Sequence, residues 1–137
     1  MMKVVIKMNR AEARVVIMTI LYQIFLCQKN NMEYDIDEII NENKESTDEF
    51  IDNTVKGVLE HKKEIFDIAN KNLKDWKIER LGLPDQAILS IGIYEILYTD
   101  TPNVVAINEA IELAKKYSDD KVKNMINKVL DNVHHEK

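Results

Sequence analysis

The stretch NRAEARVVIMTILYQIFLC, residues 9–27, decides the fold class of this chain. Asn9 is followed three residues later by Glu12, which is the spacing of a helix capping box, so we expect a helix to begin near Asn9. Beyond the first turn, apolar residues occupy most of the circumference of this helix, as in a helix enclosed by others. The stretch therefore predicts the middle helix of a bundle. It also raises the question of what Arg10 and Arg14 do at its polar start.

The rest of the chain carries helix signals and lacks strand signals. It has three glycines and two prolines, and no alternating apolar and polar run is bounded by turn residues. A second capping box is expected at Ser46 and Glu49. We expect six or seven helices, no internal repeat, and one domain spanning residues 1–137. Helical spacing of apolar residues predicts the later helices over 36–40, 46–59, 61–73, 85–98, 104–117 and from 118 onward.

The single cysteine, Cys27, excludes an internal disulfide and any metal site built from several cysteines. It lies in an apolar run, so we expect a buried, reduced thiol. The most apolar window, residues 15–27, is shorter than the roughly 20 residues that a membrane-spanning helix requires. We therefore expect no membrane association and a cytoplasmic protein.

Charge is distributed unevenly along the chain. The net charge of −5 argues against non-specific coating of nucleic acid. Residues 1–30 nevertheless hold five basic residues against one acidic residue, whereas residues 31–60 hold ten acidic against two basic. A local basic patch on an acidic body is compatible with selective RNA binding. A solvated helix end explains the same pattern, and composition alone favours that interpretation.

Residues that could support catalysis are few. The glycines are isolated, so no phosphate-binding loop is expected, and His134 and His135 fall in a polar tail. No carboxylate pair stands beside a histidine at the spacing of a helical metal site. We therefore expect no enzyme, no cofactor and no metal. Trp76 could serve as a stacking platform for a base, but a lone tryptophan near a helix boundary is more typical of a core anchor.

Three ordered blocks together resemble the NusB family of transcription antitermination factors. The first is VVAINEAIELAKKYS with NMINKVLD after a short gap, and the second is WKIERLGLPDQAILSIGIYEIL. The third is the opening stretch, which is similar to the family pattern R-R-x-A-R followed by ALYQ. Each block alone is a weak signal, but three in the right order over most of the chain form a specific one.

The resemblance implies an all-α fold with six to seven helices in two small three-helix bundles around the apolar first helix. It also implies a function without catalysis. NusB proteins bind the boxA element of nascent single-stranded RNA together with the small-subunit ribosomal protein NusE. The resulting complex helps RNA polymerase read through terminators, notably in ribosomal RNA operons. The resemblance allows either a monomer or a homodimer.

The resemblance also carries RNA-binding residues over to the start of this chain. Arg10 and Arg14 match the first and last arginines of R-R-x-A-R, and Ala11 replaces the second. Residues four apart lie on one face of a helix, so both guanidinium groups are expected to grip RNA phosphates. Lys3 and Lys7 in the preceding arm would add point charges to this contact.

A second RNA-binding surface is implied at the start of the last helix, which reads KVKNMIN. Lys121 and Lys123 are expected to contact RNA, and Met125 stands where the family usually has a phenylalanine. Asp85 and Gln86, at the LPDQ turn, are the expected contacts with NusE. Plain helix capping is the alternative for both of these residues.

Two other functions remain open from the sequence. A NusB-like domain also forms the RNA-binding front of certain ribosomal RNA cytosine methyltransferases, which need a long catalytic domain after the point where this sequence stops. Alternatively, the chain is a helical protein-interaction module that has lost RNA binding. Ala11 and Met125 motivate that second alternative, because each replaces a residue that would contact RNA.

Overall fold

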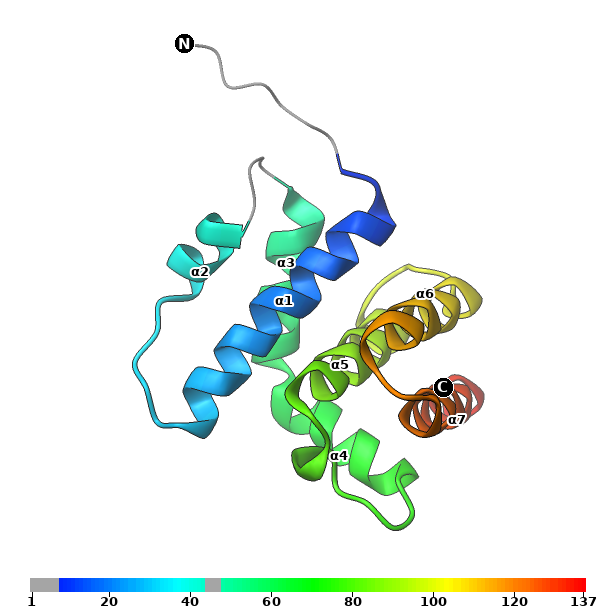
Figure 1. Cartoon of the computed structure of the whole chain (residues 1–137). Helices are drawn as coiled ribbons and strands as arrows, with labels where there is room; N and C mark the ends of the chain where they lie inside the picture. The colour runs from blue at the N-terminus through cyan, green and yellow to red at the C-terminus, as the bar shows by residue number, and fades with distance from the viewer. Residues whose placement is uncertain (1–7, 44–47) are drawn as a thin grey trace.

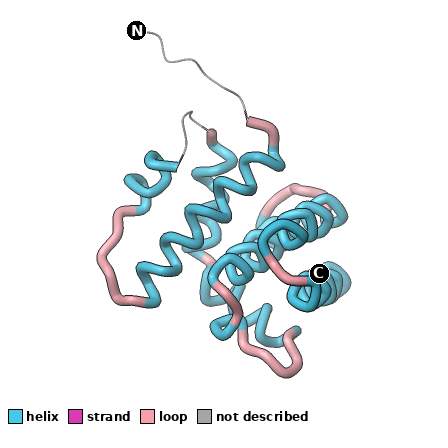
Figure 2. Tube along the Cα trace, viewed as in Figure 1, coloured by secondary structure: helices cyan, strands magenta, loops and turns pink. Residues whose placement is uncertain are grey.

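The computed structural model describes residues 8–43 and 48–137, and in this part every regular element is a helix (Figures 1 and 2). The predicted all-helical class is therefore confirmed. The elements are α1 (Arg10–Lys29), α2 (Ile36–Asn43), α3 (Glu49–Glu60), α4 (Lys62–Asn72), a 3-10 turn η1 (Ile78–Arg80), α5 (Leu83–Tyr98), α6 (Asn103–Tyr117) and α7 (Asp120–Glu136).

Side-chain caps set the starts of three helices. The Asn9 side chain accepts a hydrogen bond from the backbone N–H of Glu12 at 2.8 Å, so α1 begins where its sequence predicted. Asp119 caps α7 in the same way. At α3 the cap is Asp48. The predicted capping residue Ser46 lies outside the described residues.

Helix α5 is the most enclosed element, with ten of its sixteen residues buried. It packs against α1, α3, α4, α6 and α7, while α1 also contacts α2 and α3. In Figure 1, α1 to α3 lie on one side of the molecule and α5 to α7 on the other. The two groups meet along α1 and α5. The first helix was predicted to lie in the middle of the bundle, and in the structure α1 shares this central position with α5.

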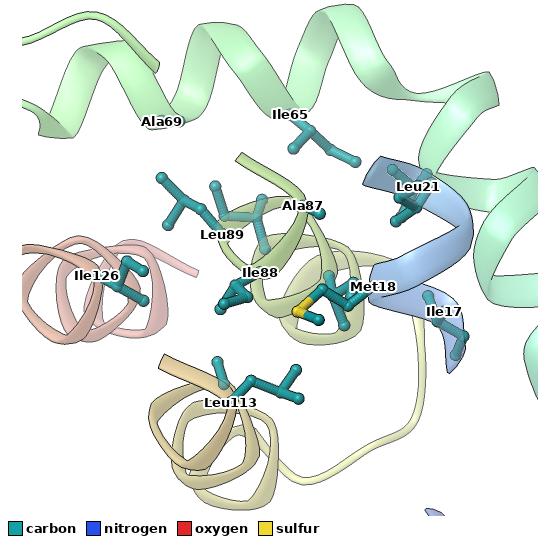
Figure 3. Packing of buried hydrophobic residues seen from close by; sticks show 14 of the residues in the cluster. Ile17, Met18, Leu21, Ile65, Ala69, Ala87, Ile88, Leu89, Leu113 and Ile126 are labelled. Carbon is teal, nitrogen blue, oxygen red and sulfur yellow. The ribbon is translucent and has the colours of Figure 1, made fainter. Parts of the chain in front are cut away.

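The core is continuous between the two groups of helices. Ile17 and Leu21 from α1 approach α5, where Leu89 in turn faces α4 and α7 (Figure 3). Gly92 allows α7 to come close to α5, because a Cβ atom at this position would lie 2.8 Å from Cδ1 of Leu130. This close approach sets the distance between α5 and α7 at Leu130.

Helix α1 corrects the expectation about membrane-spanning length. Taken as a whole helix of 20 residues, it is long and apolar enough to span a membrane by length and composition, which the window 15–27 did not reveal. In the structure its buried side chains pack in the core with α5, α3 and α2. Cys27, expected to be buried, is half-buried and carries a free thiol.

Candidate nucleic-acid interface

The residues predicted to bind RNA lie toward opposite ends of α5. Arg14 bonds Glu95 near the end of α5, whereas Ser118, just before α7, bonds Asp85 at its start. Those two α5 positions are separated by about three turns, or roughly 15 Å. The predicted contacts therefore form two surfaces. We call them the arginine end (Arg10, Arg14, Glu49, Phe50, Glu95, Asp100, Glu109) and the lysine end (Leu73, Lys74, Asp75, Trp76, Lys121, Lys123, Asn124, Met125, Lys128, Val129, Asn132).

Arg14 is held inside the protein by a bidentate ion pair. Its Nε donates to Oε2 of Glu95 at 3.0 Å and its Nη2 donates to Oε1 at 2.7 Å. Nη1 lies 3.8 Å from Oε2 of Glu109, so all three guanidinium nitrogens face carboxylates. The side chains of Arg14 and Glu95 are 5% and 1% exposed. A direct contact of Arg14 with an RNA phosphate does not fit this arrangement, and its role here is to fix α1 to α5.

Arg10 is the cation of the arginine end that remains exposed. Its guanidinium carbon lies 4.0 Å from the centre of the Phe50 ring, a cation–π geometry. The adjoining hollow of about 600 Å³ holds two arginines against three carboxylates, Glu49, Asp100 and Glu109. This end therefore presents no excess of positive charge among the described residues. Lys3 and Lys7, which were predicted to add to it, lie outside the described residues.

At the lysine end the predicted residues are accessible. Lys121 is exposed, Met125 is half-buried, and Nζ of Lys123 lies 3.7 Å from Asp120 in a surface ion pair. Such exposed pairs constrain a lysine little, so both ammonium groups can reach an anion. The predicted residues at this end thus lie where RNA could touch them.

Trp76 corrects the expectation of a core anchor, because it is 44% exposed. It follows α4 in a turn, and the ammonium nitrogen of Lys121 lies 5.7 Å from its ring. A signal in the sequence pointed this way: Lys74, Asp75 and Lys77 flank Trp76 closely, whereas a core anchor normally has apolar neighbours.

A hollow of about 320 Å³ lies between α7 and the turn after α4. We call it the lysine-end hollow. Leu73, Met125 and Val129 give it an apolar floor, and three lysines against Asp75 give it an excess of positive charge. Among the lining residues that sequence reasoning missed are Lys74 in the turn and three residues of α7. Helical spacing could have found the three on α7, because they share one face with Lys121: Asn124, Lys128 and Asn132.

The two expected NusE contacts differ in accessibility. Gln86 is 6% exposed, and its amide donates to the backbone carbonyl of Leu81 at 2.9 Å. This bond ties Gln86 to the turn before α5 but is not a helix cap, because no side chain caps the start of α5. A direct contact of the buried Gln86 with a protein partner does not fit. Asp85 is half-buried and accepts a hydrogen bond from the hydroxyl of Ser118. Only Asp85 of the pair is partly open to a partner.

Among the described residues, no group of three or more His, Cys, Asp or Glu side chains could hold a metal ion. His134 in the predicted polar tail is bonded to Asn103, with 2.8 Å between the amide nitrogen and Nδ1. It therefore has a structural contact that joins the end of α7 to the start of α6.

Comparison with known proteins identifies relatives over nearly the whole chain. Residues 11–135 match the NusB family. The transcription antitermination proteins NusB of Bacillus cereus (strain B4264) and Bacillus anthracis (strain CDC 684 / NRRL 3495) are each 37% identical over 127 residues, covering 92% of this chain and 97% of theirs.

Solved structures agree with this result. NusB of T. maritima superposes with a TM-score of 0.82 at 28% identity, covering 96% of this chain and 94% of that one. A chain from a crystal structure of antitermination factors NusB and NusE in complex with dsRNA shares the fold, with a TM-score of 0.80 at 24% identity and coverage of 93% and 97%. The extent of the family match and the identity to curated relatives show that this chain belongs to the NusB family of transcription antitermination proteins.

Proposed function

We propose that this chain is an RNA-binding antitermination factor that binds boxA-type RNA together with NusE and modifies elongation by RNA polymerase, notably in ribosomal RNA operons. The observation that carries the proposal is 37% identity over 92% of the chain to proteins named for transcription antitermination. In this proposal the whole chain is one RNA-binding domain, catalyses no reaction and works in the cytoplasm.

RNA contacts are proposed at both ends of α5, with unequal weight. At the lysine end, Lys121 and Lys123 contact phosphates and Met125 contacts a base, because all three are accessible. At the arginine end, Arg10 contacts the backbone with Lys3 and Lys7. The buried pair of Arg14 with Glu95 supports this second contact indirectly, by holding α1 in place.

NusE is proposed to contact the protein near Asp85, at the start of α5. The carboxylate of Asp85 is already oriented by Ser118, and it stands close to the first turn of α7. A partner docked here would lie beside the lysine end. Gln86 would support the contact by keeping the turn before α5 closed through its bond to the carbonyl of Leu81.

A protein-interaction module without RNA binding is the second candidate. The observation that favours it is the acidic lining of the arginine-end hollow, which lowers the attraction for phosphate at one of the two proposed surfaces. The methyltransferase alternative has no comparable support. The curated relatives are named for antitermination, and the match to this chain covers 97% of their length.

The two candidates are separated by a fluorescence anisotropy titration. Labelled boxA-type RNA and a scrambled RNA of equal length are titrated with the protein, with and without NusE, at several salt concentrations. We expect tighter binding of the boxA-type RNA when NusE is present and a log–log fall of affinity with salt. Equal binding of both RNAs in every condition would contradict boxA-directed function, and no binding of either RNA would favour the interaction module.

A further inference from the structure

We infer that the lysine-end hollow holds one unpaired nucleobase of the bound RNA, stacked on the ring of Trp76. The inference deepens the proposed function and rests on it. It adds a base-binding subsite built on the turn after α4 to contacts that were otherwise expected from α1 and the start of α7.

The first step is the exposure of the ring. Tryptophan carries the largest apolar side chain, and leaving 44% of it in water forgoes much of the stabilisation that burial would give. The ring stands beside an apolar floor of Leu73, Met125 and Val129 that it does not cover. A flat ligand inserted in the hollow would bury both the exposed ring and this floor.

The second step is the charge around the hollow. Lys74, Lys121 and Lys128 line it against a single carboxylate, that of Asp75. The ammonium of Lys121 lies 5.7 Å from the ring centre of Trp76. A base on the ring would thus have its own phosphate within reach of a lysine, which is the combination that single-stranded nucleic acid binding uses. An apolar peptide segment would gain nothing from three lysines.

Two asparagine side chains that line the hollow have amide groups available to a ligand. Within the described part of the chain, the side-chain amides of Asn124 and Asn132 make no hydrogen bond to other residues. Each offers a donor pair and an acceptor, which can bond the edge of a base splayed out of a strand. The volume of about 320 Å³ suits one nucleotide rather than several.

Met125 lines the hollow together with Trp76. Met125 places a thioether in the second turn of α7, where the NusB family usually has a phenylalanine ring, so a base cannot stack at this position. Trp76 lines the same hollow as Met125 and provides a ring from the neighbouring turn. The ring of Trp76 is thus the aromatic surface that this hollow offers to a base.

The test uses Trp76 as its own reporter, because it is the only tryptophan in the chain. Unlabelled boxA-type RNA is titrated into the full chain while tryptophan emission is recorded, with anisotropy of labelled RNA measured in parallel. We expect RNA to quench the emission over the same concentration range in which anisotropy reports binding. Trp76→Ala should weaken RNA binding at least about fivefold, and Trp76→Phe, which keeps a ring, should retain most of the affinity. Lys56→Gln on α3 is the matched surface control, and circular dichroism checks folding of each variant.

A second arm locates the base. A series of RNAs, each lacking one base, is titrated with the parent and with Trp76→Ala. On the RNA that lacks the stacked base, the two proteins should bind equally, whereas on every other RNA the variant should bind more weakly.

The outcomes separate the two levels of proposal. Binding without quenching, together with unchanged affinity of Trp76→Ala, would overturn the base subsite and leave the antitermination function standing. Quenching by NusE alone, in the absence of RNA, would assign the hollow to a protein segment and overturn the subsite. Failure of the parent to bind either RNA would remove both proposals.

Discussion

The arginine end and the lysine end of α5 differ in how their positive charges are partnered. Two arginines at the first are set against carboxylates on several elements, and Arg14 is buried. The hollow at the second is lined by three lysines and one carboxylate, that of Asp75, and Lys121 is exposed. The end with the stronger RNA-binding motif in the sequence is therefore the one with less free charge in the fold. A basic residue is available for recognition where the fold has not buried it against a carboxylate.

The physical reason lies in contacts distant in sequence. Glu95 is 81 residues from Arg14 and comes to it only when α5 packs on α1. In this position a buried pair fixes the two helices, because either charge alone in the core would be strongly unfavourable. The comparison thus predicts that substitutions at the arginine end act mainly on stability and those at the lysine end mainly on RNA binding.

The largest expected effect is on the ion pair. Arg14→Met should lower the free energy of unfolding by about 3–5 kcal/mol, because Glu95 remains buried without its partner. Urea denaturation followed by circular dichroism measures this. The double variant Arg14→Met, Glu95→Leu removes both charges and should be more stable than either single variant. If Arg14→Met stayed folded at full stability and lost RNA affinity, Arg14 would be a direct RNA contact after all.

The next effect concerns the packing that carries the lysine end. Gly92→Ala places a methyl group against Leu130 and should cost about 1–3 kcal/mol, since α7 must shift away from α5. We expect the folded variant to bind RNA more weakly through the displaced lysine end. Leu130→Val in the same protein makes room and should restore part of both losses. Weakened stability with unchanged RNA binding would show that the position of α7 is not critical for recognition.

Removing two exposed lysines of the lysine end should change RNA affinity and leave the stability of the fold nearly unchanged. Lys121→Ala with Lys128→Ala should weaken binding of boxA-type and scrambled RNA alike and lower the salt slope by about 2. Unfolding free energy should change by less than about 0.5 kcal/mol, because both side chains are exposed. Arg10→Ala is the comparison variant. A larger loss of affinity from Arg10→Ala than from the double lysine variant would reverse the weights given to the two ends.

The sequence allowed the helices to be predicted because their signals are local. Asn9 and Asp119 cap helices through residues three positions away, and the apolar stripes repeat within single helices. The roles of Arg14 and Trp76 depend instead on other helices. Whether a carboxylate meets Arg14, or α7 covers the ring of Trp76, is decided by packing that no short window of sequence contains.

Lys62 is a partly buried cation, intermediate between the buried Arg14 and the exposed lysines, and we expect it to have the smallest effect on stability. This half-buried ammonium donates to Oε1 of Gln28 at 2.7 Å and lies 4.8 Å and 4.9 Å from the ring centres of Phe25 and Phe66, with no carboxylate in the contact. Burial lowers the pKa of Lys62, against a weaker opposing effect of Glu79. The folded protein therefore holds this proton less tightly than the unfolded chain does.

It follows that the charge on Lys62 opposes folding at neutral pH. This penalty should fade as pH rises through the lowered pKa toward the unfolded value near 10.5. Urea unfolding of the parent and of Lys62→Met over this range isolates the effect, because the other titrating groups are common to both proteins. The stability of the parent should gain on that of the variant as pH increases. A stability difference that stayed constant, or a parent that lost stability relative to the variant as pH rose, would mean that Gln28 and the two rings stabilise the ammonium fully, so that a buried cation here needs no carboxylate, unlike Arg14.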